Sequence, residues 1–130
     1  MATINKLEDL EIWQLAREIC KDVWFLFETT SLGNDFKLKN QMNGSSGSIM
    51  DNIAEGFERN GRREFIQFLS IAKGSCGELK SQLYRSLDRK HITMEQFQPV
   101  FEKADLENKK IGSFMSYLVK SEIKGSKFDK

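Results

Sequence analysis

Residues 65–87 read FIQFLSIAKGSCGELKSQLYRSL and indicate the fold class. Apolar side chains recur in this stretch at spacings of three and four, namely Phe65, Leu69, Ala72, Cys76, Leu79, Leu83 and Leu87. That period is typical of an amphipathic α-helix with one apolar stripe. The stripe keeps its phase throughout, so the sequence predicts a long helix that reaches His91.

The opposite side of this helix carries small residues. At 100° per residue, one stripe nearly opposite the apolar one contains Ser70, Gly74, Gly77 and Ser81, and Ile66 and Tyr84 flank it. Glycine inside a helix costs up to about 1 kcal/mol relative to alanine. Gly44 and Gly47 lie in a second predicted helix, which precedes this one in the chain, and each adds a similar cost there.

We expect this cost to be offset by a backbone that approaches more closely than side chains normally allow. The stripe of small residues then makes a contact with another subunit, and Ile66, Ser70, Gly74, Gly77, Ser81 and Tyr84 are the candidate oligomer interface. The alternative is a bare face whose serines are solvated. The contact is favoured because exposed glycines would leave the propensity cost without compensation. The residues do not distinguish a ring from a dimer.

The same periodicity outlines the rest of the chain. It predicts a helix from Leu7 to Thr30 with Asn5 as its cap, and a second helix that begins after Asn34 or Asp35 and stops near Asn60. The residues TMEQ (93–96) read as a capping box that opens a fourth helix. Four such helices with short loops predict an all-α, up-down-up-down four-helix bundle over residues 1–123, followed by a flexible basic tail over 124–130.

Composition limits the function classes. The chain has 130 residues, with 20 basic and 19 acidic side chains and a formal charge of +1, which argues against a strongly basic nucleic-acid binder. Its first 20 residues carry several charges, and its longest apolar run is Val23 to Phe27, too short to cross a membrane. We therefore expect a cytoplasmic protein without a membrane partner, in which Cys20 and Cys76 are free buried thiols. A redox or disulfide role for the two cysteines is the alternative.

No pattern in the sequence indicates catalysis. His91 is the single histidine, in DRKH (88–91), so the paired Glu-x-x-His motifs of a di-iron bundle are missing. The glycine pairs lack the strand and the Gly-Lys-Ser/Thr of a phosphate loop. The sequence predicts no enzyme, no metal, no cofactor and no small-molecule substrate. His91 is interpreted as a residue of a helix C-terminus, favoured there by the helix dipole.

Charge is distributed unevenly along the chain. Residues 1–36 carry three basic and seven acidic side chains, a net of −4, and residues 103–130 carry seven lysines and four acids, a net of +3. The up-down topology brings one basic set to one end of the bundle, and its members are the candidate nucleic-acid contacts: Arg59, Arg62, Arg63, Lys120, Lys124 and Lys127. Acidic residues at the same end offset most of this charge, so an ordinary solvated surface is the alternative.

Several motifs together resemble a known family. LEIWQLA (10–16), NIAEGF (52–57), RREFIQFLSIAKGS (62–75) and EL-x-x-QL (78–83) are similar to the small four-helix-bundle proteins encoded in intervening sequences of bacterial 23S ribosomal RNA genes. The resemblance implies a left-handed bundle that assembles as a homopentamer and brings no catalytic residues. It extends to the accessory bundle of diversity-generating retroelements, which engages nucleic acid and reverse transcriptase. Where members often carry a basic pair and a proline, this chain has Asn43-Gly44 and Met50.

The family motif has a structural interpretation. Gly56 allows a close backbone approach, and Asn52 and Glu55 hydrogen-bond across helices or cap backbone groups. A ligand role for Asn52 and Glu55 is the alternative. The leading functional hypothesis is a non-enzymatic homo-oligomeric bundle that acts as an RNA- or DNA-associated accessory factor. The competing hypothesis is a protein–protein adaptor without nucleic-acid affinity.

Overall fold

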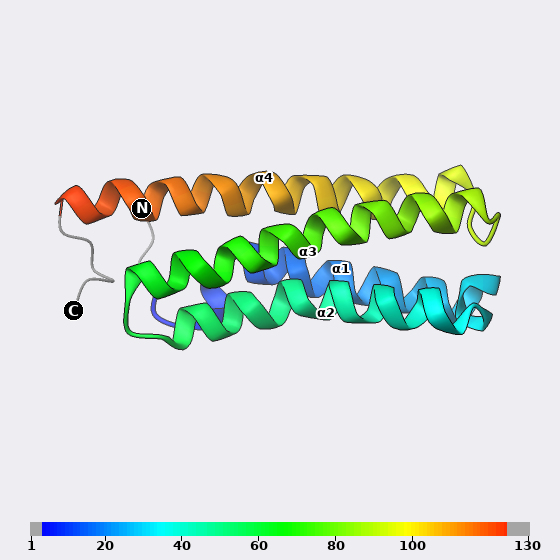
Figure 1. Ribbon diagram of the computed structural model, residues 1–130, viewed down its shortest axis with the longest axis horizontal. Helices are drawn as coiled ribbons and strands as arrows, with labels where there is room; N and C mark the ends of the chain where they lie inside the picture. Colours follow the sequence, from blue (N-terminus) through cyan, green and yellow to red (C-terminus); the bar gives the residue numbers. More distant parts are fainter. Residues whose placement is uncertain (1–3, 125–130) are drawn as a thin grey trace.

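The computed structural model describes residues 4–124 and contains four long helices (Figure 1). They are α1 (Glu11–Thr29), α2 (Phe36–Glu58), α3 (Arg62–Asp88) and α4 (Met94–Lys124). Successive helices run in opposite directions, so that α1 and α3 point one way and α2 and α4 the other (Figure 1). The predicted all-α, up-down arrangement of four helices is confirmed. Of the predicted tail, Lys124 ends α4, and residues 125–130 lie outside the described part.

Helix α1 begins four residues later than the sequence predicts, at Glu11 rather than Leu7. Leu7–Asp9 form one 3-10 turn, Leu10 is extended, and the α-helix begins at Glu11. Asn5 does not cap it. Its backbone N–H instead donates to Asp9 Oδ2 at 3.4 Å. The predicted start at Leu7 is therefore wrong, because Asp9 binds backbone groups ahead of it and holds a tight turn there.

A short 3-10 turn, Ser31–Asn34, connects α1 to α2. Thr30 opens it, since the Thr30 hydroxyl accepts from the Leu32 backbone N–H at 3.2 Å. Asp35 then caps α2, and its Oδ1 accepts from the Leu38 N–H at 3.4 Å. This confirms one of the two caps expected for the second helix.

The end of α3 corrects the interpretation of His91. The helix stops at Asp88, and Lys90 takes a positive φ of 60°. The His91 N–H then reaches the Ser86 carbonyl at 3.0 Å and the Lys90 N–H reaches the Leu87 carbonyl at 2.9 Å, a Schellman motif. His91 thus lies beyond the helix.

The His91 ring joins the two loops at this end of the bundle. Its Nδ1 lies 2.7 Å from the Ser31 hydroxyl and its Nε2 lies 3.0 Å from Asp35 Oδ2. Arg89 donates to the same carboxylate at 2.8 Å. The hydrogen bonds from Arg89 and His91 hold the pKa of Asp35 below its ordinary value.

The predicted capping box opens α4. The Thr93 N–H donates to Gln96 Oε1 at 2.9 Å, and the Gln96 N–H donates to the Thr93 hydroxyl at 3.1 Å. Pro99 lies inside this helix near its start. The capping box compensates there for terminal N–H groups that the first turn leaves without helical partners.

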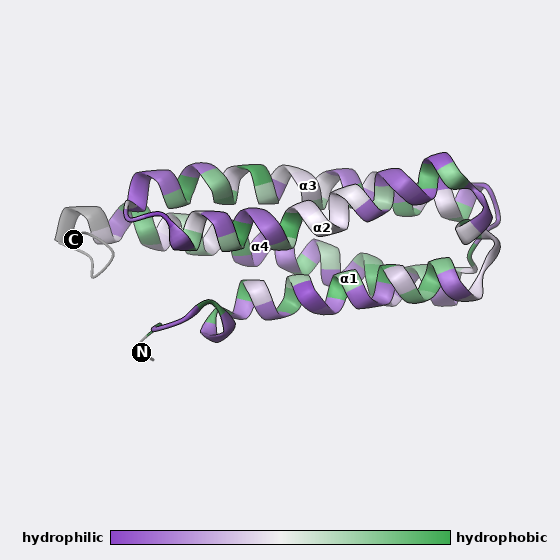
Figure 2. Ribbon diagram, turned by 90° about the horizontal axis from the view of Figure 1, so that it is seen from below, coloured by the Kyte–Doolittle hydropathy of each residue, from purple (hydrophilic) through white to green (hydrophobic). Residues whose placement is uncertain are grey.

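The helices enclose one apolar core along the axis of the bundle. All but one of the residues in the apolar stripe predicted for α3 are buried, and the exception, Leu87, is half-buried. Green and purple residues alternate along each ribbon in Figure 2, as expected for helices with one inward face. Within the described residues, no helix is long and apolar enough to cross a membrane.

Gly56 makes the predicted close approach. A methyl group on its Cα would lie 2.8 Å from Phe65 Cδ1 and 2.8 Å from Phe68 Cβ. Alanine does not fit there without displacing an aromatic ring. Gly56 therefore lets the end of α2 pack against the start of α3.

Candidate interaction surface

The outward face of α3 is exposed and nearly free of side chains. Ser70, Gly74, Gly77 and Ser81 are all exposed, and the middle of α2 and α3 is pale in Figure 2, neither hydrophilic nor hydrophobic. A methyl group placed on Gly74 or Gly77 would meet no atom within 4 Å. Within residues 4–124, no backbone from the other helices therefore approaches these glycines. We refer to these four residues as the bare face.

Two larger side chains border the bare face on the side of α4. Ile66 is half-buried. Tyr84 is 50% exposed, and its ring centroid lies 5.1 Å from that of Phe97 and 5.1 Å from that of Phe101. The exposed half of Tyr84 lies beside the bare face, where an approaching partner would contact it.

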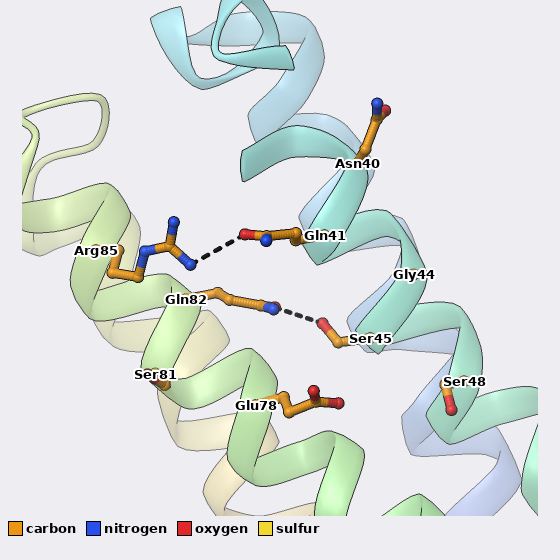
Figure 3. A pocket seen from close by; sticks show the side chains of 9 residues that line it. All are labelled: Asn40, Gln41, Gly44, Ser45, Ser48, Glu78, Ser81, Gln82 and Arg85. Atoms are coloured by element: carbon orange, nitrogen blue, oxygen red, sulfur yellow. Dashed lines mark hydrogen bonds between the residues drawn. The ribbon is translucent and has the colours of Figure 1, made fainter. Parts of the chain in front are cut away.

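A polar groove of about 530 Å³ runs along the other border, between α2 and α3 (Figure 3). Gly44 and Ser81 line it without filling it. Two hydrogen bonds cross it: the Ser45 hydroxyl donates to Gln82 Oε1 at 2.6 Å, and Arg85 donates to Gln41 Oε1 at 3.0 Å. The groove therefore continues the bare face toward α2.

Asn52 and Glu55, the polar residues of the family motif, also lie on α2. Asn52 Nδ2 donates to the Ser48 carbonyl at 2.8 Å and to the Ser48 hydroxyl at 2.9 Å. The Ser75 hydroxyl of α3 donates to the same Ser48 hydroxyl at 2.9 Å. Asn52 thus acts through Ser48 rather than reaching α3 directly. Glu55 stays on its own helix and binds Arg59 at 3.0 Å.

Not all of the basic residues predicted to contact nucleic acid lie on the surface. Arg62 is only 5% exposed. Arg59 pairs with Glu55 at 3.0 Å and with Glu64 at 3.6 Å. Of the others, Arg63 and Lys120 are exposed, whereas Lys127 and the side chain of Lys124 lie outside the described residues. Arg62 is therefore removed from the predicted contacts, because a buried guanidinium does not reach a phosphate on the surface.

One buried group was missed by the sequence analysis. Glu107 is 0% exposed, and neither carboxylate oxygen has a hydrogen-bond partner in the described part of the chain. Burial raises its pKa to about 8. Burial and the neighbouring Glu107 charge raise the pKa of the Cys76 thiol to about 12.

A signal for Glu107 was present in the sequence. Val100, Ala104, Glu107 and Ile111 follow one another at spacings of four, three and four, which is the spacing of a core stripe. An acidic residue at such a position reads as a gap in the apolar pattern. Only the packed structure shows that the carboxyl group occupies the core.

Among the described residues, no group of three or more histidine, cysteine, aspartate or glutamate side chains is arranged to hold a metal ion. Cys20 and Cys76 are free thiols, and Cys20 is held in a hydrogen bond to the Ser46 carbonyl at 3.2 Å. Of the surfaces described above, the bare face with its adjoining groove is suited to contact with another macromolecule.

The fold and this surface define a four-helix up-down bundle with one helix face left open for contact. The model of the 23S rRNA-intervening sequence protein family matches residues 8–113, and the chain belongs to that family. A solved structure from Bacteroides thetaiotaomicron, a protein with unknown function from the S23 ribosomal protein family, is similar with a TM-score of 0.73. The two are 25% identical in sequence, over 80% of this chain and 97% of that chain. Comparison with curated proteins gave no match.

Proposed function

We propose that this chain is a non-enzymatic helical bundle that assembles with copies of itself through the bare face of α3. The observation that carries the proposal is the open space around Gly74 and Gly77, where an added methyl group meets nothing within 4 Å. Each glycine costs up to about 1 kcal/mol in a helix. Nothing within the described chain compensates for that cost, whereas a neighbouring copy packed on the face would.

The family resemblance adds finer features to the proposal. It implies five copies and a left-handed turn of the bundle. The two free cysteines fit a reducing compartment, which supports the cytoplasm as the location.

The test is the mass of the assembly and its response to a bulky residue on α3. The 15.0 kDa chain should sediment as an oligomer, and Gly77→Arg should reduce it toward the monomer. Because this position is exposed and open, the variant should keep its helical circular dichroism. Gln98→Arg, on an exposed part of α4, is the matched control. A monomeric wild-type chain, or an unchanged Gly77→Arg oligomer, contradicts the proposal.

For the partner of the assembly, we favour a protein over a nucleic acid. Arg62 is buried, and Arg59, although exposed, pairs with two glutamates. Arg63 and Lys120 are thus the exposed cations of the predicted set that take part in no ion pair within the described chain. Phosphate binding depends on several unpaired cations acting together. The bundle is therefore better suited to act as an adaptor between proteins.

Titration with structured RNA and with duplex DNA at two salt concentrations separates these possibilities. If the chain is a protein adaptor, it should bind RNA and DNA weakly or not at all, with little dependence on salt. An affinity that falls steeply with salt, and that Arg63→Ala and Lys120→Ala both reduce, overturns the adaptor and supports the nucleic-acid accessory factor.

A further inference from the structure

The α1 helix carries exposed aromatic side chains on the side facing away from the core. Trp24 is 47% exposed and Phe25 is 62% exposed. Together with Cys20, Met50 and the charged residues Arg17, Lys21 and Glu28 they line a shallow groove of about 440 Å³ between α1 and α2. Lys39 of α2 lies over the Trp24 ring, with its Nζ 5.5 Å from the ring centroid. Exposed tryptophan within an apolar groove is typical of protein–protein contacts, where aromatic anchors contribute much of the binding energy.

Two opposite charges flank Trp24 on the same stripe of α1. Lys21, Trp24 and Glu28 stand at positions i, i+3 and i+7, so their side chains share one side of the helix. In the described part of the chain, neither Lys21 nor Glu28 takes part in a salt bridge. Read along α1, the stripe is positive, aromatic and negative.

The next acids along α1 do not interfere with this pattern. Lys103 of α4 binds Asp22 at 2.8 Å and Glu18 at 3.3 Å. Both carboxylates are thus directed toward α4. The charges at Lys21 and Glu28 remain available to a partner.

The border of the bare face carries the reverse pattern. Glu78, Ser81 and Arg85 of α3 stand at the same spacing of three and four, and they read negative, small and positive. Glu78 is exposed. Arg85 hydrogen-bonds the neutral amide of Gln41 at 3.0 Å, which leaves its charge uncompensated. Glu78 and Arg85 also border the groove shown in Figure 3.

The direction of the helices decides how the two stripes match. Within one chain, α1 and α3 run the same way (Figure 1). In a cyclic assembly whose axis follows the bundles, every copy points in one direction, so α1 of one copy runs parallel to α3 of the next. Parallel alignment sets Lys21 against Glu78 and Glu28 against Arg85. Antiparallel alignment would instead bring Lys21 to Arg85, a repulsive pair.

The parallel alignment also matches the shapes of the two surfaces. Trp24 stands midway between its two charges, and Ser81 stands midway between Glu78 and Arg85. The indole ring of one copy therefore meets the bare face at Ser81 and Gly77, where the space around Gly77 is open. A bulky side chain on one helix would fill the hollow left by small ones on the other.

From this complementarity we propose that the Lys21–Trp24–Glu28 stripe of α1 is the docking site for the bare face of a second copy of this chain. The two copies lie side by side, and the interface is heterologous because it joins two different surfaces. This rests on the proposed self-association and specifies its second surface. Each copy presents one stripe and one bare face, so every added copy leaves one of each unoccupied until a ring closes.

The test is an exchange of charges, followed by sedimentation velocity of the full chain at low ionic strength. Lys21→Glu and Glu78→Lys each replace an attraction with a repulsion, and each should weaken self-association about tenfold. The double variant restores an opposite-charge pair and has the net charge of the wild type. It should recover the wild-type association within about threefold.

Matched controls are Lys37→Glu and Glu102→Lys, which change charge at exposed positions on α2 and α4. Neither should change the association by more than about twofold. Trp24→Ala should weaken association at least tenfold while the circular dichroism spectrum of the chain stays helical.

The outcomes separate this inference from the proposed function. If the wild type is oligomeric and the double variant shows no recovery, or if Trp24→Ala assembles normally, the docking site on α1 is overturned while self-association stands. A wild type that remains monomeric at all concentrations overturns both.

Discussion

The buried carboxyl group of Glu107 leads to the sharpest stability prediction. Its side chain is 0% exposed, and its oxygens have no hydrogen-bond partner within the described chain. The ionised form is therefore penalised in the folded state, and Lys110 offsets only part of this cost. Glu107→Gln keeps the shape of the protonated side chain and removes the ionisation.

The direction in which pH changes stability depends on the pKa of Glu107 in the folded and in the unfolded chain. In the folded chain the pKa of Glu107 is about 8, against an ordinary value of 4.5. Between these pH values the folded chain binds more protons than the unfolded chain, so the contribution of Glu107 to stability falls as pH rises. With about 1.4 kcal/mol for each pH unit, the wild type should lose roughly 3 kcal/mol relative to Glu107→Gln by pH 7 and somewhat more by pH 9.

Urea denaturation of both chains, followed by circular dichroism from pH 4 to pH 9, measures this difference. Protein concentration is held fixed because self-association also changes stability. The two free energies of unfolding should be within about 1 kcal/mol near pH 4 and should separate steadily up to pH 8. Comparing the two chains cancels the titration of the other carboxylates. If the difference between the chains stays constant from pH 5 to pH 8, Glu107 is not held protonated by burial and the reasoning is refuted.

Three further predictions concern other parts of the fold. Lys90→Gly should raise the free energy of unfolding by about 0.5–1 kcal/mol, because glycine accepts the positive φ at this position; a lower melting temperature would contradict it. Gly56→Ala should destabilise the chain by about 1–3 kcal/mol in urea titration, because the new methyl group meets Phe65 and Phe68 at 2.8 Å; unchanged stability would show that the rings move freely. The buried thiol of Cys76, with a pKa of about 12, should resist a disulfide exchange reagent at pH 8 and react once the chain is unfolded in guanidinium; rapid modification of the folded chain would disprove its burial.

The sequence alone determined that the chain forms four helices in an up-down order, whereas α1 begins later and α3 ends earlier than the sequence predicts. Residues such as Leu69, Cys76 and Leu83 repeat with the period of a helix, and this property depends only on neighbouring residues. The Thr93–Gln96 capping box is likewise local, because its two hydrogen bonds join residues three apart. Gly56 was also predicted, since a glycine beside a helix junction indicates a close approach.

Other features depended on which groups from distant segments meet, and only the tertiary structure decided them. The ring of His91 joins two loops because Ser31 and Asp35, far away in sequence, lie within hydrogen-bond distance of it. Arg62 is buried and Glu107 is enclosed in the core, although arginine and glutamate usually lie on the surface of a protein. The glycines of α3 are the converse case: their pattern was visible in the sequence, but only the packing of the four helices shows that no part of the described chain covers them. Periodicity reports the side of its own helix on which a residue lies, whereas burial also depends on what the other helices place opposite it.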